Sequence, residues 1–311
     1  MSDPKTKKLL LPLDGSERGL RTIRDQSCFT PFQNMEIRLF HVFNAVPETY
    51  WDLEKEPVSS SSVKYVRAWE FQKRNEIQAF MDKACEQLIS TGFSASNIRI
   101  DIHDRKKGVA RDILLEAKEG YDAVITRRRG FSAFRGISIG SVAVKLLDKL
   151  SFIPTIVSGR ERPNKNVLIA LDGSEASMRA VDLVTALLGN FPEKVGLVYV
   201  VRSREGEIPA CHPLYAPSGF VRERKKEIEP VFADAKSRLA KAGFPSGRVK
   251  VEMISGVRSR AEAIAAKADR ENYGVIVMGR KGLTRTEDFS MGRVTYKVVQ
   301  LATHPTIWIV P

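Results

Sequence analysis

Residues 9–23 read LLLPLDGSERGLRTI, and residues 167–181 read VLIALDGSEASMRAV. The two stretches align along their whole length, with Asp14 opposite Asp172 at an offset of 158 residues. In each stretch, an apolar run typical of a buried parallel strand leads into Asp-Gly-Ser, and the serine is a good N-cap for the helical pattern that follows. Because this strand–turn–helix unit occurs twice, we predict that the chain repeats one α/β fold.

Four further pairs of segments repeat in the same order. They are LFHVF at 39–43 with LVYVV at 197–201, DAVITRRRGF at 122–131 with GVIVMGRKGL at 274–283, IGSVAVKLL at 139–147 with MGRVTYKVV at 291–299, and IPTIVS at 153–158 with HPTIWIV at 304–310. A length of 311 residues also fits two domains of ordinary size. We therefore predict a first domain at 1–160 and a second at 161–311, with the boundary in the polar stretch 159–164.

Strands and helices alternate within each predicted domain. Beyond the first strands, at 8–13 and 166–171, the pattern predicts long helices that end at a glycine at 63–91 and 218–243, short helices at 109–119 and 258–270, and strands at 98–103, 248–254, 122–126, 274–278, 154–158 and 305–310. This alternation favours a parallel sheet with right-handed crossovers. Pro12 interrupts the first strand and should lie where the sheet needs no N–H donor.

The composition, with 43% hydrophobic and 28% charged residues, is ordinary for a soluble globular protein. No apolar run reaches the ~20 residues of a membrane helix, and none resembles a secretion signal, which predicts a cytoplasmic protein without a membrane partner. The three cysteines and four histidines are scattered. Neither a disulfide framework nor a metal site is therefore expected.

The formal net charge of +13 favours anionic partners such as phosphorylated small molecules, nucleic acid or anionic lipid. The basic residues are spread along the chain, and we interpret the densest runs, at 105–107, 127–129 and 222–226, as solvated faces and loops. No aromatic-interleaved or helix-turn-helix pattern accompanies them, so the sequence does not favour nucleic-acid binding.

Glycines follow the fourth predicted strand of each half. The second half has Gly279-x2-Gly282-x9-Gly292-Arg293, and the first has Arg127-x2-Gly130-x9-Gly140-Ser141. Ligands of open parallel sheets gather where the strands end, and a glycine turn before a helix offers N–H groups to a phosphate. Asp14 and Asp172 could accept a hydrogen bond from a base or a ribose. Two simpler interpretations stay open: the glycines only serve the turns, and the aspartates only cap their helices.

At these residues the chain resembles the universal stress protein family, once in each half. The resemblance implies two tandem flavodoxin-like or Rossmann-like domains, each with a five-stranded parallel or mostly parallel sheet and helices on both faces. Nucleotide-binding members carry Gly-x2-Gly-x9-Gly-Ser/Thr and bind ATP or AMP. The matching positions are Asp14, Val42, Gly130, Gly140, Ser141 and Val142 in the first half, and Asp172, Val200, Met278, Gly279, Gly282, Gly292 and Val294 in the second.

Each half departs from this motif at one arginine. Arg127 stands where the first glycine belongs, and its side chain could crowd a ribose or contact a phosphate. Arg293 stands where Ser or Thr belongs, and its guanidinium could pair with phosphates. We include both arginines among the candidate binding residues and expect the second half, which keeps all three glycines, to be the occupied one.

Two long segments and two short strands suggest further roles. Residues 47–62 and 202–219 follow the second strand of each half and contain Tyr50, Trp51 and Tyr215, so they are either lids over a ligand or surface loops. In the resembling family, the last strands of two domains pair to form a dimer. The resemblance therefore implies pairing of 154–158 with 305–310 inside this chain and leaves a further homodimer open.

We therefore predict a stress-response or regulatory protein that binds an adenine nucleotide, ATP or AMP, with or without Mg²⁺. The sequence shows no Ser–His–Asp order, no cysteine beside a base and no P-loop, which predicts a protein that is not an enzyme and leaves only slow ATP hydrolysis open. The alternative is a tandem scaffold with degenerate nucleotide pockets that acts through protein partners. Arg127 and Arg293 favour this alternative.

Overall fold

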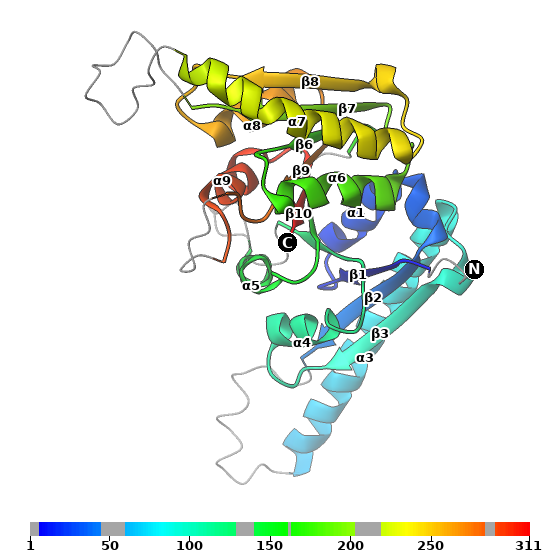
Figure 1. The fold of residues 1–311 in the computed structure, drawn as a ribbon. Helices are drawn as coiled ribbons and strands as arrows, with labels where there is room; N and C mark the ends of the chain where they lie inside the picture. Colours follow the sequence, from blue (N-terminus) through cyan, green and yellow to red (C-terminus); the bar gives the residue numbers. More distant parts are fainter. Residues whose placement is uncertain (1–5, 45–59, 129–139, 161–162, 203–218, 284–289) are drawn as a thin grey trace.

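The computed structural model describes residues 6–44, 60–128, 140–160, 163–202, 219–283 and 290–311. They form one ten-stranded sheet in the order β3-β2-β1-β4-β5-β10-β9-β6-β7-β8 (Figure 1). The strands are β1 (Lys8–Pro12), β2 (Glu36–Phe43), β3 (Ile98–Asp104), β4 (Ala123–Arg127), β5 (Thr155–Ser158), β6 (Asn166–Ala170), β7 (Lys194–Val200), β8 (Val249–Ile254), β9 (Val275–Gly279) and β10 (Thr306–Val310). Each half of the chain contributes five strands in the same Rossmann-like order, which confirms the predicted α/β fold.

Helices cover both faces of the sheet (Figure 1). They are α1 (Glu17–Gln26), α3 (Ser60–Ser90), α4 (Val109–Glu116), α5 (Ser141–Lys149), α6 (Glu175–Leu188), α7 (Phe220–Lys241), α8 (Arg260–Arg270) and α9 (Arg293–Leu301). On one face, α1, α3, α6 and α7 pack on a single apolar core that runs through both halves. On the other face, α4 and α5 cover the first half, and α8 and α9 cover the second.

The predicted element boundaries agree with the structure to within a few residues. The two long helices end just before Gly92 and Gly243, whose positive φ angles of 101° and 81° turn the chain out of the helix. The short helix predicted at 109–119 ends earlier, at Glu116. Its last residues instead form tighter turns, in which the N–H groups of Lys118 and Glu119 bond to carbonyls three residues back.

The two halves join through their last strands. β5 and β10 run antiparallel, whereas the other strand pairs of the described sheet are parallel. In this pairing Ile156 lies opposite Trp308, and the two occupy equivalent places in their halves, because Ile156 pairs with Ile125 of β4 and Trp308 pairs with Val277 of β9. An approximate two-fold axis therefore passes between them, and the pairing of the last strands inside the chain is confirmed.

Pro12 shortens one ladder of the first half. Leu13, the next residue, donates its N–H to Phe40 of β2, so the ring nitrogen of Pro12 faces β4 on the opposite side. The β1–β4 pairing covers only Leu9 and Leu10. In the second half, the equivalent β6–β9 pairing continues to Ala170. The proline therefore lies where the sheet has no hydrogen bond to lose, as the sequence predicts.

One interpretation of the basic runs is wrong at Arg128. The run 127–129 was expected to be solvated, but the Arg128 side chain is only 5% exposed. Its guanidinium donates to the carbonyl oxygens of Val299 and Ala302, at the carboxyl end of α9. Unsatisfied carbonyls at a helix end are good partners for a buried cation, and they lie far away in sequence. In the described part of the chain, no helix is long and apolar enough to cross a membrane.

Candidate functional site

Two cavities open at the carboxyl ends of the central strands, one in each half. The first cavity, of about 330 Å³, lies beyond β1, β2 and β4. The second cavity, of about 430 Å³, lies beyond β6, β7 and β9. In both halves, neighbouring central strands send their connections to opposite faces of the sheet at this edge, which is where open α/β sheets bind ligands.

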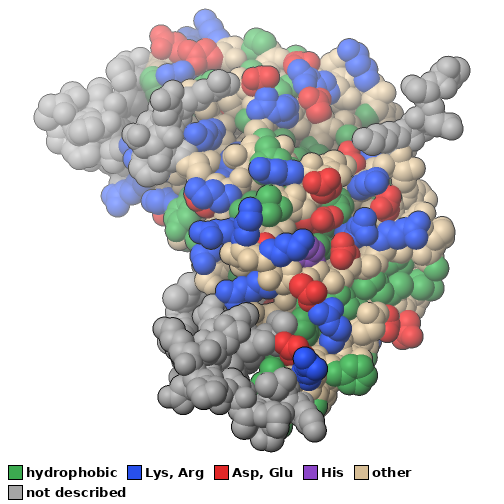
Figure 2. Space-filling model, turned by 90° about the horizontal axis from the view of Figure 1, so that it is seen from below, with side chains coloured by type: hydrophobic (Ala, Val, Ile, Leu, Met, Phe, Trp, Pro, Cys, Tyr) green, Lys and Arg blue, Asp and Glu red, His purple; other side chains and the backbone are tan. Residues whose placement is uncertain are grey.

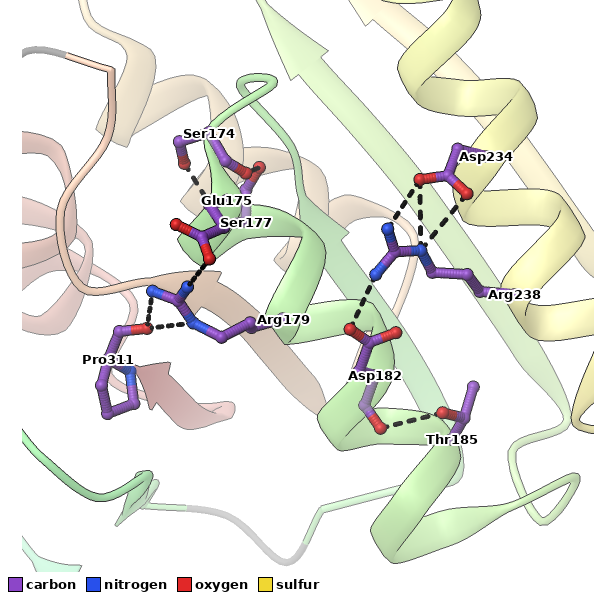
Figure 3. Close-up of polar contacts among 9 residues, drawn as sticks. All are labelled: Ser174, Glu175, Ser177, Arg179, Asp182, Thr185, Asp234, Arg238 and Pro311. Carbon is purple, nitrogen blue, oxygen red and sulfur yellow. Dashed lines mark hydrogen bonds and ion pairs between the residues drawn. The ribbon is translucent and has the colours of Figure 1, made fainter.

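The Asp-Gly-Ser turns hold the start of α1 and α6. Oδ1 of Asp172 accepts hydrogen bonds from the N–H and Oγ–H of Ser174, at 3.0 and 2.6 Å. Ser174 Oγ in turn accepts from the N–H of Ser177, at 3.2 Å (Figure 3). Asp14 and Ser16 form the same turn in the first half, at 3.1 and 2.6 Å. One oxygen of each carboxylate therefore has the capping role that the simpler interpretation predicts.

Further contacts fix α6 beside the second cavity. Figure 3 shows Arg179 reaching from α6 to the carbonyl oxygen of Pro311, to which its Nε and Nη2 donate at 2.8 and 2.6 Å. Arg238 of α7 pairs with Asp182 of α6 at 2.7 Å and with Asp234 of its own helix at 2.8 Å. The helix that presents the aspartate turn is thus held on two sides.

The three glycines of the second-half motif, Gly279, Gly282 and Gly292, lie where a Cβ atom would come close to neighbouring atoms. A Cβ on Gly282 would lie 2.3 Å from Oδ2 of Asp172, and one on Gly279 would lie 3.0 Å from the backbone of Ala176 in α6. Gly292 donates its N–H to the carbonyl oxygen of Arg280 at 2.9 Å and precedes the first residue of α9. The turn therefore brings bare backbone and a helix amino end to the cavity wall, which suits an anion.

Positive side chains surround the second cavity. Arg224, Arg260, Lys281 and Arg293 line it, and Asp172 is the one acidic side chain among its described lining residues. Arg260 Nε donates to the carbonyl oxygen of Val200 at 3.2 Å, and Arg224 pairs with Glu227 at 2.6 Å. Burial raises the pKa of the Tyr199 hydroxyl, also at the wall, so this side chain stays neutral near pH 7. The excess of positive charge favours a ligand with several negative charges.

The first cavity is less basic. Arg127 lines it, but its guanidinium is turned onto α1, where it donates to the carbonyl oxygen of Arg18 at 2.6 Å and to Oγ1 of Thr22 at 3.0 Å. His41 stands at the position of Tyr199, with Nδ1 2.8 Å from the carbonyl oxygen of Leu13. Burial lowers the pKa of His41, which keeps this imidazole neutral at pH 7.

The predicted binding residues gather in these two cavities. The first cavity is lined by Asp14, Val42, Arg127, Gly140, Ser141 and Val142. The second is lined by Asp172, Val200, Met278, Gly279, Gly282, Gly292, Arg293 and Val294. Gly130 lies outside the described residues, as do Tyr50, Trp51 and Tyr215 of the predicted lid segments.

Sequence reasoning missed the cavity walls formed by the neighbouring helices. In the second half these are Phe220 and Arg224 at the start of α7 and Arg260 and Ile264 of α8. Their place in an amphipathic helical pattern gives no sign that they face a cavity. His41 and Tyr199 also line the cavities. Because side chains alternate between the two faces of a strand, neither residue was expected to lie beside the predicted Val42 and Val200.

Among the described residues, no three His, Cys, Asp or Glu side chains lie close enough to hold a metal ion. The charge on the molecule is also mixed in sign. Figure 2 shows one face on which Lys and Arg side chains are interspersed with Asp and Glu. Such a surface differs from the continuous basic stripe of nucleic-acid-binding proteins.

Comparison with known proteins assigns the second half to a family. Residues 163–310 match the model of the universal stress protein family. The universal stress protein YxiE of Bacillus subtilis (strain 168) is 26% identical over 146 residues, which cover 45% of this chain and 95% of that protein. The universal stress protein MJ0531 of Methanocaldococcus jannaschii is 27% identical over 168 residues, which cover 53% of this chain and 94% of that protein.

A solved structure resembles the whole chain. The crystal structure of a universal stress protein from Archaeoglobus fulgidus DSM 4304 matches with a TM-score of 0.61 at 20% sequence identity, covering 99% of each chain. A putative universal stress protein from Pseudomonas aeruginosa UCBPP-PA14 matches with a TM-score of 0.58 at 14% identity, covering 98% of this chain and 93% of that one. The fold is therefore shared over both halves.

Proposed function

We propose that this chain belongs to the universal stress protein family, whose model matches residues 163–310, and that it is a regulatory, stress-response protein that binds ATP or AMP in its second cavity. The chain would consist of two tandem domains, at 1–160 and 161–311, each with its own cavity. It would bind its ligand and would not act as an enzyme. The soluble interior of the cell, the cytoplasm, is the proposed location.

The observation that carries the proposal is the glycine turn of the second half. Gly279, Gly282 and Gly292 leave backbone exposed at the amino end of α9, a helix of nine residues. A helix amino end attracts phosphate through its free N–H groups and its dipole. Arg293, the first residue of that helix, is exposed and adds a guanidinium that can pair with a phosphate.

The rest of the cavity suits a nucleoside. Apolar side chains such as Val200, Met278 and Ile264 provide surfaces for a base. Oδ2 of Asp172 lies beside Gly282, where it can accept a hydrogen bond from a ribose hydroxyl. A Mg²⁺ ion bound mainly by phosphate oxygens and water would not need a protein cage, which agrees with the sparse acidic groups of the wall.

Calorimetric titration of the purified full chain with ATP and AMP, with and without Mg²⁺, tests the proposal. We expect a dissociation constant in the micromolar range, and a nucleotide released when the purified protein is heated. The variant Gly282→Ala places a Cβ against Asp172 and should weaken binding about ten-fold or more. The matched control is Gly247→Ala, because a Cβ there meets nothing within 4 Å and Gly247 has no positive φ. Absence of binding and of released nucleotide for wild type would refute the proposal.

One observation favours the scaffold alternative, but only for the first half. Arg127 replaces the first glycine, and its guanidinium is bound to α1 rather than directed to a ligand. A first cavity that no longer binds nucleotide would leave that half as a partner surface. Titration decides between the two functions: one site per chain fits a scaffold in the first half, and two sites exclude it.

A further inference from the structure

Two buried arginines cross the boundary between the halves. Arg128 follows β4 and Arg280 follows β9, and the two correspond in the sequence repeat. They are 5% and 3% exposed. Each belongs to the turn that lines the cavity of its own half, because Arg128 follows Arg127 and Arg280 lies between Gly279 and Gly282.

Each arginine binds the carboxyl end of a helix in the other half. Arg280 Nη2 donates to the carbonyl oxygens of Leu147 and, at 3.0 Å, Asp148, and its Nη1 donates to that of Leu150 at 3.2 Å. These carbonyls end α5. Arg128 donates to Val299 and, at 2.5 Å, to Ala302, which end α9. The two sets of contacts are related by the approximate two-fold axis, since Val299 and Ala302 correspond to Leu147 and Leu150.

The carbonyl oxygens at a helix end are partners that suit a buried cation. Burial lowers the pKa of Arg280, and it lowers that of Arg128 to about 10, which leaves both guanidinium groups charged at pH 7. The partial negative charge at the helix end offsets part of the cost of burial. A lysine offers no planar fork and could not bond several carbonyls in the same way. The contacts are therefore specific to arginine.

The same two helices begin at the cavities. The N–H of Gly292, before α9, donates to the carbonyl oxygen of Arg280, and the N–H of Gly140, before α5, donates to that of Arg128. Each helix thus has its amino end tied to one arginine and its carboxyl end tied to the other. These hydrogen bonds form a closed ring. Arg280 binds the carboxyl end of α5, and the amino end of α5 is bound to Arg128. Arg128 binds the carboxyl end of α9, and the amino end of α9 is bound to Arg280.

We propose that Arg128 and Arg280 are positioning residues that set the glycine turns of both cavities and couple the occupancy of one cavity to the other. The inference rests on the proposed function, since the ligand is the proposed nucleotide. A phosphate that orders the turn at Gly292 fixes Arg280, which fixes α5 and the wall of the first cavity. A second ligand then meets a turn that is already ordered, and the coupling is positive.

The experiment compares the full chain with Arg280→Met, Arg280→Lys and Arg128→Met, and uses the exposed Arg248→Met as the matched control. Binding of ATP is measured by calorimetry, and amide hydrogen exchange is followed at 140–150 and 290–302 with and without ATP. Urea unfolding establishes that each variant is folded. Arg280→Lys keeps the charge and serves where Arg280→Met fails to fold.

We expect the dissociation constant for ATP to rise about ten-fold in both Arg280 variants and to stay unchanged in Arg248→Met. ATP should slow exchange in α5 as well as in α9 of wild type, and the α5 effect should disappear in the Arg280 variants. A folded Arg280 variant with wild-type affinity would overturn the inference, because the arginine would then serve only the interface.

Failure of the proposed function is distinguished by the exchange data without ligand. If wild type binds no ATP, nucleotide binding is refuted, yet loss of Arg280 should still speed exchange at both 146–150 and 290–296. Loss of Arg128 should do so at 140–144 and 298–302. Faster exchange confined to the freed carboxyl ends of the helices, with both glycine turns unchanged, would refute the positioning role.

Discussion

The two halves share one strand order but differ where the central strands end. In the second half, Ala170 continues the β6–β9 ladder and Gly279 lets α6 approach the strand end. In the first half, Pro12 stops the β1–β4 ladder and Arg127 extends its side chain over α1. The fold therefore accepts two different arrangements at the ends of its central strands. The two cavities that result differ in charge and size. Conservation of a fold across a repeat does not preserve the chemistry of its sites.

The halves also differ on the two-fold axis itself. The first half places Ile156 there and the second half places Trp308, both fully buried. The indole lies 6.0 Å from the ring of Phe29 and 6.1 Å from that of Phe32, measured between centroids. Those phenylalanines belong to the first half, so the second half supplies the residue that fills the centre and the first half supplies its surroundings. The interface is symmetric in its backbone and asymmetric in its packing.

The largest effect is expected from Trp308→Ala, which removes this asymmetric contact. Truncation of a buried aromatic leaves a cavity and should lower the free energy of unfolding by about 3–5 kcal/mol. Urea unfolding followed by circular dichroism measures the loss. Ile156→Ala is the comparison across the axis and should cost less, about 2–4 kcal/mol, because a smaller side chain is removed. Equal losses for both variants would show that the packing around the axis is more symmetric than the aromatic cluster indicates.

The sequence predicts the repeat, the succession of strands and helices along each half, and the aspartate and glycine turns. These features depend on local patterns: apolar runs such as 9–13, the glycines that end helices, and Asp-Gly-Ser before a helix. The structure places those turns at two cavities, and whether nucleotides occupy them stays a prediction.

The sequence does not predict contacts between distant segments. In the run 127–129, nothing distinguishes the buried Arg128 from its neighbours, because its partners are carbonyl oxygens of α9, about 170 residues away. Arg224 and Arg260 were missed for the same reason, since only the packing of α7 and α8 brings them to the second cavity. Every residue has a backbone carbonyl oxygen, so the amino-acid type of the partner does not show that a distant side chain binds it.

A smaller effect is expected from exchanging the residues at the ends of β1 and β6. Ala170→Pro removes an N–H that faces β9, since the next residue, Leu171, donates to β7 on the other side. Loss of this ladder bond leaves a buried acceptor without its partner, which should cost up to about 3 kcal/mol. The reverse change, Pro12→Ala, should be nearly neutral, because no residue of β4 pairs with residue 12 and the restored N–H gains no partner there. Thermal unfolding of both variants checks the contrast, and a large loss from Pro12→Ala would contradict the account of the shortened ladder.

The smallest effect concerns a cluster of charges in the second half. Lys267, with a side chain 3% exposed, pairs with Glu271 at 2.5 Å, and Glu271 also pairs with Lys194 at 3.1 Å. The hydrogen bond from Lys267, and then the one from Lys194, outweigh the effect of burial and hold the pKa of Glu271 at about 2, below its ordinary value of 4.5. The first half has the exposed Leu115 and Glu119 at the positions of Lys267 and Glu271.

Glu271→Gln should therefore lower the free energy of unfolding by about 2 kcal/mol at pH 7. A carboxylate whose pKa is lower in the folded state stabilises that state above pH 4.5, and this contribution falls as the pH drops towards 2. The difference between wild type and variant should shrink over the same range, as measured by urea unfolding at several pH values. Glu119→Gln, the matched change in the first half, should stay within about 0.5 kcal/mol of wild type throughout, because its carboxylate is exposed. If the difference in free energy of unfolding between wild type and Glu271→Gln does not change with pH, the substitution acts through packing. The charge cluster would then not distinguish the stability of the two halves.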